Sequence, residues 1–303
     1  MSETQDSSTE KPKKSGLEWL HERTEQAKQE MAAAELEKKR QAATLERSLP
    51  AWPHEVRGVP NALLRSALFG ISQERIVHQK RTLIAAVEGY EVRFKGETFN
   101  QTDLDVLEAM LHLALPHPLG KRVEFSVYAF LKALGRGTSG KHHEEFKEQV
   151  MRLVTGGIEI TDTKSRKTFM GTLVSKAFRE EDTGRYVVIF DNDMLNLYEG
   201  GYSHVDWNQR TALGKSALAK WLHGFYSTHA KPYPYKVETL HTLCGSSDKS
   251  LRSFRQKLKK ALEDLISVGA ILGWSINDDD LVTIERTPSS AQEKHLKRAA
   301  KRR

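Results

Sequence analysis

Two stretches of this chain carry helix and strand patterns in the same order. In the first, helical segments precede β-rich runs, at residues 102–115, 123–134, 141–155, 158–161, 168–178 and 185–190. In the second, three helical segments precede two strands, at residues 211–229, 237–244, 246–268, 270–276 and 281–285. Three helices followed by a β-hairpin is the order of a winged helix, a variant of the helix-turn-helix. We therefore predict an α+β protein with two tandem winged-helix domains.

The segments outside these two stretches differ from them in composition. Residues 1–15 are polar, which predicts disorder, and residues 17–48 are strong helix formers with few large apolar side chains. Three prolines around Trp52 then mark a linker. We predict a flexible, partly helical N-terminal extension with its linker, a first winged-helix domain, a second one and a basic C-terminal tail, at residues 1–58, 59–200, 201–287 and 288–303.

Two local patterns in the first domain lead to further predictions. Residues 90–99 alternate apolar and polar side chains around Lys95-Gly96, which predicts a hairpin with its turn at that pair. Thr102 is placed to cap the helix that follows.

The segment Ser246–Val268 predicts a helix with one apolar stripe and one basic face. The stripe consists of Leu251, Phe254, Leu258, Leu262 and Leu265, which recur every three or four residues. Opposite it lie Lys249, Ser253, Gln256 and Lys260, with Arg252 and Lys257 at its flanks. Such a face can neutralise phosphates and hydrogen-bond base edges in a DNA major groove. A solvated surface helix is the alternative, and the position as third helix of a winged helix favours DNA reading.

Composition restricts the class of protein and its partners. The formal net charge is +7, which favours an anionic partner, nucleic acid before a membrane surface. The single cysteine, Cys244, excludes a disulfide framework and indicates a reducing compartment. The N-terminus has no apolar core of a signal peptide, and no run reaches the ~20 apolar residues of a membrane span. We therefore predict a soluble, cytoplasmic protein.

A glycine run gives the sharpest alternative, a nucleotide hydrolase. Gly135-Arg-Gly-Thr-Ser-Gly140 with Lys141 approaches a P-loop, and Tyr186–Asp191 is an apolar strand ending in Asp. His142 stands where the magnesium-binding hydroxyl belongs, however, and the parallel β/α alternation is missing. Glycines there suit a tight turn between two helices. Gly214-Lys-Ser216 is only a fragment of the same motif.

Other chemical motifs are incomplete. His241 and Cys244 have the spacing of a zinc pair, but no second pair completes four ligands. Asp278-Asp-Asp280 is better explained as a solvated turn than as a metal site. The sequence therefore predicts no enzyme, with no catalytic centre, metal or cofactor.

Several motifs, in order, resemble those of the TrfA-type plasmid replication initiators. In the second domain these are Tyr233-Pro-Tyr235, the run Leu240–Ser246, the basic helix, and Trp274–Val282 with one extra Asp. Upstream matches are Pro60-Asn61, Arg65–Phe69 and Phe225–His229, so that the similarity runs from about Trp52 to Arg286. One departure is Ala43–Arg47, which replaces the family's clamp-binding pentapeptide, so this motif does not carry clamp binding over.

The resemblance implies a bacterial protein that binds double-stranded origin repeats, called iterons, and helps to open the plasmid origin. It implies recruitment of host DnaA, the replicative helicase and the polymerase clamp, and monomer–dimer self-association in copy control. The second domain would read the iterons, and the first would supply backbone contacts and dimerisation. The matching DNA-contact positions are Lys249, Arg252, Ser253, Arg255, Gln256, Lys259 and Lys260.

The residues themselves add a contrast between the two domains. The helix at 141–155 mixes acidic and basic side chains, so we expect it to contact phosphates sparingly. Arg255, nearer the apolar stripe, suits phosphate or packing. The acidic turn of the second hairpin, Asn277–Asp280, is expected to sit away from the DNA backbone or to face a partner protein. A sequence-specific autorepressor without initiator activity would need the same helix and remains an alternative.

Overall fold

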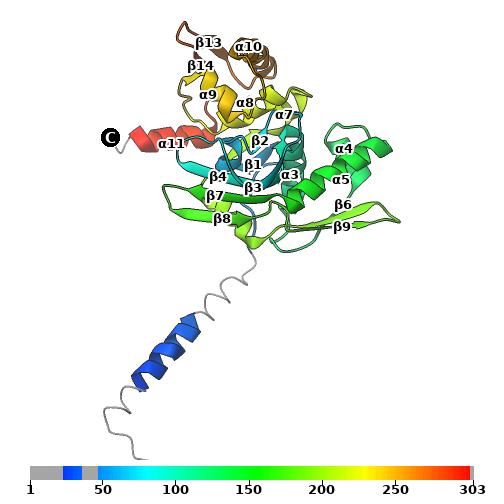
Figure 1. Ribbon diagram of the computed structural model, residues 1–303, viewed down its shortest axis with the longest axis vertical. Coiled ribbons are helices and arrows are strands. Elements are labelled where there is room, and N and C mark those ends of the chain that lie inside the picture. Colours follow the sequence, from blue (N-terminus) through cyan, green and yellow to red (C-terminus); the bar gives the residue numbers. More distant parts are fainter. Residues whose placement is uncertain (1–22, 36–46, 301–303) are drawn as a thin grey trace, which may run out of the picture. The chain divides into compact units, whose positions relative to one another are not determined.

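The structure, a computed structural model, describes residues 23–35 and 47–300 (Figure 1). The chain divides into two compact units, residues 1–46 and 47–303. In the first unit, residues 23–35 form a helix whose side chains are all exposed, as expected for a solvated helix. The rest of the predicted extension before residue 47 lies outside the described residues.

The second winged helix contains three helices and three strands. Its elements are α8 (Ala217–Ser227), β12 (Tyr235–Lys236), α9 (Val237–Leu243), α10 (Leu251–Ser267), β13 (Gly273–Ile276) and β14 (Leu281–Glu285). The strands form an antiparallel sheet in the order β12-β14-β13. The helices and this sheet enclose one hydrophobic core that runs from Leu213 to Ile284.

The first winged helix repeats this topology. It contains α3 (Gln101–Ala114), β6 (Val123–Ser126), α4 (Val127–Ala133), α5 (Gly140–Thr155), β9 (Lys176–Glu180) and β10 (Arg185–Ile189). Its strands pair in the order β6-β10-β9, so the last strand again lies between the other two. The predicted fold class, two tandem winged helices, is therefore confirmed.

An additional sheet distinguishes the first domain. Between α5 and β9 the chain forms β7 (Gly157–Asp162) and β8 (Lys167–Gly171), which join β3 (Val77–Ile84) and β4 (Tyr90–Glu97) in the order β3-β4-β7-β8. Figure 1 shows this sheet beside α3. The first hydrophobic core, from Leu49 to Val205, includes side chains of this sheet as well as of the winged helix.

Shorter elements connect these parts. They are β1 (Val56–Pro60), α2 (Asn61–Leu64), β2 (Phe69–Gly70), β5 (Phe99–Asn100), a 3-10 helix η1 (Asn192–Met194), α6 (Leu195–Glu199), β11 (Tyr202–Asp206), α7 (Trp207–Ala212) and α11 (Ser290–Ala300). Strand β1 pairs antiparallel with β11, and β2 pairs parallel with β5. The predicted basic tail thus contains the helix α11.

In this part of the chain two local predictions were wrong and one was incomplete. Residues 90–97 form one continuous strand, because β3 and β7 pair along both of its edges. Gly96 there permits close approach, since an added Cβ would lie 3.2 Å from the Cα of Gly156. The predicted helix at 211–229 is broken around Gly214, which has φ +56°. The run at 168–178 is β-rich as predicted, but it is divided between β8 and β9, which belong to different sheets.

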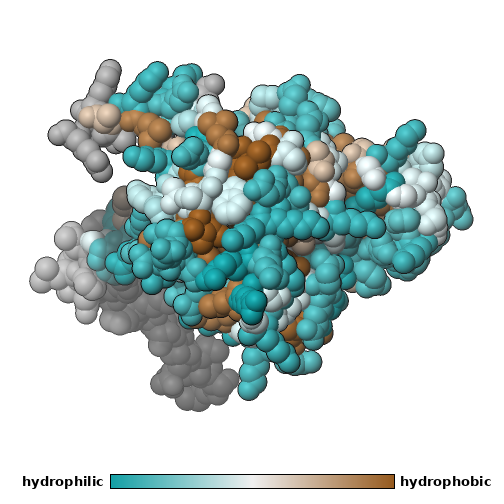
Figure 2. Space-filling view, turned by 90° about the horizontal axis from the view of Figure 1, so that it is seen from above, coloured by the Kyte–Doolittle hydropathy of each residue, from teal (hydrophilic) through white to brown (hydrophobic). Residues whose placement is uncertain are grey.

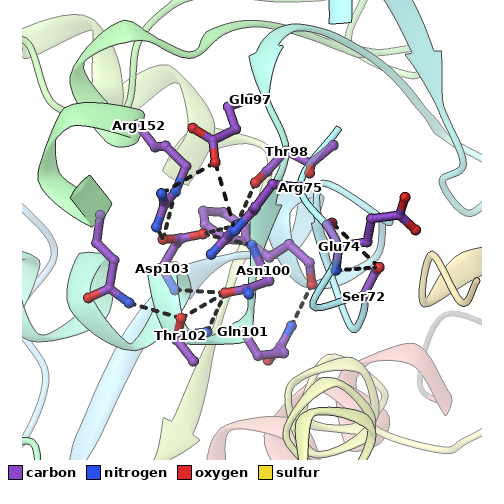
Figure 3. Close-up of polar contacts among 12 residues, drawn as sticks. Ser72, Glu74, Arg75, Glu97, Thr98, Asn100, Gln101, Thr102, Asp103 and Arg152 are labelled. Atoms are coloured by element: carbon purple, nitrogen blue, oxygen red, sulfur yellow. Dashed lines mark hydrogen bonds and ion pairs between the residues drawn. The ribbon is translucent and has the colours of Figure 1, made fainter. Parts of the chain in front are cut away.

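The helix α3 is capped by Asn100 and not by Thr102. The Asn100 side chain accepts from the backbone of Thr102 and Asp103, and Asp103 returns a contact to the Asn100 backbone, which is a capping box. Figure 3 shows how Asp103 also receives the guanidinium groups of Arg75 and Arg152, at 2.8 and 2.9 Å. The fully buried carboxylate thereby joins α3, α5 and the segment before β3.

The predicted linker packs onto the first core. Leu49 and Trp52 are buried, the Trp52 ring stacks on Tyr198, and its Nε1 donates to Nδ1 of His112 at 3.2 Å. At the other end, the pairing of β11 with β1 joins residues 202–206 to the first domain. A boundary after Asp206 fits these contacts better than one at residue 200, and the division into domains stays a prediction.

Candidate nucleic-acid interface

The helix α10 is held in the second core by its apolar stripe. Phe254, Leu258, Leu262 and Leu265 are fully buried. Leu251, which was expected in the same stripe, is 39% exposed at the start of the helix. The helix ends before Gly269, whose φ of +72° lets the backbone of Ala270 donate back to Leu265 at 2.9 Å. The opposite side of α10 is therefore fixed toward solvent.

The predicted DNA-contact residues divide into two groups. Lys249, Arg252, Gln256, Lys259 and Lys260 are exposed, and within the described residues their side chains have no hydrogen-bond or ion-pair partner. Ser253 lies among them and is half-buried. Unpaired cations and an unpaired amide are free to meet phosphates and base edges. Arg255 forms the second group, because its guanidinium already donates hydrogen bonds to the carboxylate of Asp280.

Two ion pairs lie at the edges of this exposed row. The guanidinium of Arg255 donates to both carboxylate oxygens of Asp280, in the turn between β13 and β14. Lys257 pairs with Asp248 in the segment before α10. Neither pair could be predicted from the sequence, because helical spacing does not reveal which acidic residue of a neighbouring turn reaches the helix.

The hairpin turn is strongly constrained. Asp280 has φ +61°, its backbone nitrogen donates to the carbonyl of Asn277 at 3.0 Å, and its own carbonyl accepts from Val237 at 2.9 Å. The Asn277 side chain in turn accepts from the backbone of Leu281. Asp280 thus ties the hairpin to α9 by its backbone and to α10 by its side chain.

An open groove of about 700 Å³ runs along one side of α10. Its walls come from both winged-helix domains or the segments joined to them, at residues 71–74, 215–218 and 246–248 and at Lys257, Lys260, Ala261 and Asp264. Residues 71–74 are far from α10 in the sequence, so no pattern could have placed them here. Lys215 belongs to the fragment Gly214-Lys-Ser216, which lies at the start of α8.

Buried charges connect α3 of the first domain to the second. Arg210 on α7 is 1% exposed, and its Nε lies 2.9 Å from Asp105 and 2.8 Å from Glu108. Lys220 on α8 contacts Asp105 at 2.8 Å. Burial raises the pKa of Glu108 to about 7, whereas the pKa of Asp105 is lowered by its cations, Arg210 first, against the effect of burial. This network fixes how α3 meets α7 and α8.

The third helix of the first domain presents a different surface. On α5, Lys141 lies near Glu145, and Lys147 lies near Glu144. Arg152 is directed inward to Asp103 (Figure 3). Opposite charges alternate on this helix, in agreement with the expected contrast between the two domains.

The glycine run and the His241–Cys244 pair serve the fold and do not form a nucleotide or metal site in the described residues. Gly135–Gly140 connects α4 to α5, so the strand that precedes a P-loop is replaced by a helix. His241 donates to the carbonyl of Asp248 at 2.8 Å, and burial raises the pKa of Cys244 to about 12. In the described part of the chain, no three His, Cys, Asp or Glu residues gather as metal ligands.

The surface seen in Figure 2 is mainly hydrophilic, with hydrophobic residues in separate patches. Within residues 23–35 and 47–300, no helix is long and apolar enough to span a membrane.

Comparison with known proteins agrees with this architecture. The sequence matches the family described as TrfA protein over residues 11–286. The chain belongs to the TrfA family. It is 26% identical over 289 residues to the plasmid replication initiator protein TrfA of Escherichia coli, which covers 91% of this chain and 74% of that protein.

A solved structure of RctB shares the fold of this TrfA-family chain. The crystal structure of RctB domains 2-3 has a TM-score of 0.51 at 10% identity, and the match covers 75% of this chain and 97% of the RctB chain. A selenomethionine structure of RctB domains 2 and 3 has a TM-score of 0.47 at 11% identity, covering 68% and 84% of the two chains.

Proposed function

We propose that this protein is a plasmid replication initiator that binds origin iterons through α10. The observation that carries the proposal is the row of unpaired polar and basic side chains on the third helix of the second winged helix. In the helix-turn-helix class, the recognition helix enters the major groove and its exposed side chains contact base edges. The family relative named a plasmid replication initiator gives the biological setting.

Within this proposal the residues have different roles. Arg252, Ser253 and Gln256 lie in the middle of the exposed row and read bases, while Lys249, Lys259 and Lys260 contact phosphates. The first domain supplies few backbone contacts and mediates self-association, in keeping with the paired charges of α5. The protein acts in the bacterial cytoplasm, opens the origin, and recruits host DnaA and the replicative helicase. Recruitment of the polymerase clamp would need a contact other than the family's pentapeptide, which Ala43–Arg47 replaces.

A complementation experiment tests initiation itself. A plasmid that keeps its origin but lacks this gene is maintained only when the protein is supplied in trans. If the protein protects the origin DNA but does not restore replication, it is a repressor and the proposed function is wrong.

Footprinting on the origin tests the interface. Arg252→Ala or Gln256→Ala weakens binding to the protected sequence by about 1–3 kcal/mol if the side chain reads a base. Lys147→Ala, on the equivalent helix of the first domain, is the matched control and leaves the footprint unchanged, since Lys147 faces Glu144. Equal effects of all three changes would show that α10 is not the reading helix.

A further inference from the structure

The contact between Arg255 and Asp280 joins the recognition helix to the wing. One terminal nitrogen of Arg255, Nη2, donates to both carboxylate oxygens, and the two side chains are 38% and 36% exposed. They therefore lie at the boundary between the core and the outer face of α10. A charge-assisted contact of this kind is stronger and more directional than a neutral hydrogen bond.

The rest of the Arg255 guanidinium is unoccupied. Its Nε is buried without a hydrogen-bond partner in the described residues, and Nη1 has no partner there either. On the helix, Arg255 is three or four residues from Arg252 and Lys259, which are exposed on the proposed DNA-contact face. Nη2 is thus held by the wing and Nε is buried, while Nη1 stays available beside the other DNA-contact residues.

We infer that Asp280 is a positioning residue, which holds Arg255 in the orientation that reads a base. The inference rests on the proposed function. Nη1 is the guanidinium donor left for a base edge, and a hydrogen bond from it to guanine O6 or N7 requires a fixed direction of the guanidinium plane. Asp280 is suited to impose that direction because its backbone is anchored to Asn277 and Val237.

Whether the loss of the Asp280 charge weakens or strengthens DNA binding distinguishes a positioning role from simple electrostatic repulsion. Asp280 carries a negative charge beside a helix that meets phosphates, so charge alone predicts that its removal strengthens binding to any DNA. Positioning predicts the opposite for the specific sequence, because Arg255 loses its orientation. Asp278 and Asp279 lie in the same turn, and no side-chain partner contacts either in the described residues, so they provide matched controls.

The experiment uses the full-length protein and random-sequence duplex DNA, from which the wild type selects its preferred duplex. Dissociation constants are then measured for that duplex and for a scrambled duplex of equal composition. Asp280→Asn removes the charge but keeps a residue that tolerates positive φ. We expect Asp280→Asn to reduce the preference for the selected duplex on the order of 10-fold, and Arg255→Ala by about 10- to 100-fold.

The control variants should not reduce the preference for the selected duplex. Asp278→Asn and Asp279→Asn leave the preference intact and keep or raise the affinity for both duplexes. In the Arg255→Ala background, Asp280→Asn causes no further loss of preference, since there is no guanidinium left to position. Thermal unfolding is measured for each variant, and Asp280→Ala repeats the test if the asparagine variant is unstable.

Two results would overturn the inference. One is an Asp280→Asn variant that behaves like Asp279→Asn; the other is an equal loss of affinity for both duplexes, which indicates wing packing alone. Failure of the proposed function is seen separately and earlier, as a wild-type protein that does not distinguish the selected from the scrambled duplex, and the inference then fails with it.

Discussion

Replacing Arg210 by methionine removes the central cation of the buried network between the two winged-helix domains. Methionine has a similar length but no charge, so Glu108 loses its guanidinium contact while Asp105 keeps Lys220 at 2.8 Å. Breaking a buried ion pair by removing one partner costs about 3–5 kcal/mol. We expect a loss of this size in the free energy of unfolding, because all four charged side chains of the cluster, Arg210, Asp105, Glu108 and Lys220, are buried.

The loss of unfolding free energy in Arg210→Met is expected to increase with pH. Burial already raises the pKa of Glu108 to about 7 from its ordinary value of 4.5, and without Arg210 the pKa rises further. A carboxyl group with a raised folded-state pKa favours folding at low pH, and this contribution disappears as the pH increases through the folded-state pKa. Arg210→Met is therefore more destabilising at pH 8 than at pH 6.

Urea denaturation of the full chain, followed by circular dichroism at both pH values, measures this effect. Lys167→Met is the control, since its contact with Glu199 is exposed and worth about 0–1 kcal/mol. The double variant Arg210→Met/Glu108→Met should recover most of the loss, because no uncompensated charge remains. A loss below about 1 kcal/mol at pH 8 would refute the view that Arg210 holds the two domains together.

Three further outcomes follow from the structure. Burial lowers the pKa of His223 to about 3 from 6.5, so the free energy of unfolding of the wild type falls as the pH decreases below 6.5. In acid denaturation, His223→Gln reduces the slope of this free energy against pH by up to about 1.4 kcal/mol per pH unit. Trp52→Ala costs about 3–5 kcal/mol in urea unfolding, because the buried ring packs against Gly58; an unchanged midpoint would contradict the docked linker. Lys259→Ala weakens binding to all DNA sequences alike and lowers the slope of log affinity against log salt by about 0.9, whereas an unchanged slope would remove Lys259 from the phosphate contacts.

The element order of the second winged helix could be predicted from the sequence because its segments are continuous, whereas β7 and β8 interrupt the first winged helix and join a different sheet. The stripe Phe254–Leu265 alone fixed which side of α10 is buried, and the exposed row followed from it. Glycine was harder to interpret, since the same residue marks a turn at Gly214 and a close backbone approach at Gly96. The choice depends on neighbouring strands that are distant in sequence.

Apart from the Lys257–Asp248 pair, the unpredicted parts of the site depend on contacts between segments that are distant in the sequence. Periodicity indicates that Arg255 lies near the apolar stripe, but only the fold brings Asp280 to it. The groove beside α10 likewise needs residues 71–74, and the buried network needs α3 to meet α7. The recurrence of apolar residues every three or four positions carries no information on which distant residues meet in the fold.

The pairing of β1 with β11 has a consequence for synthesis of the protein on the ribosome. Residues 56–60 find their partner only at residues 202–206, after almost the whole first domain has been made. A strand pair with such long separation closes late, because the intervening chain must be ordered first. The nascent first domain therefore stays open at this seam until Asp206 has emerged, and a chain ending at residue 200 should remain sensitive to proteases along Val56–Pro60.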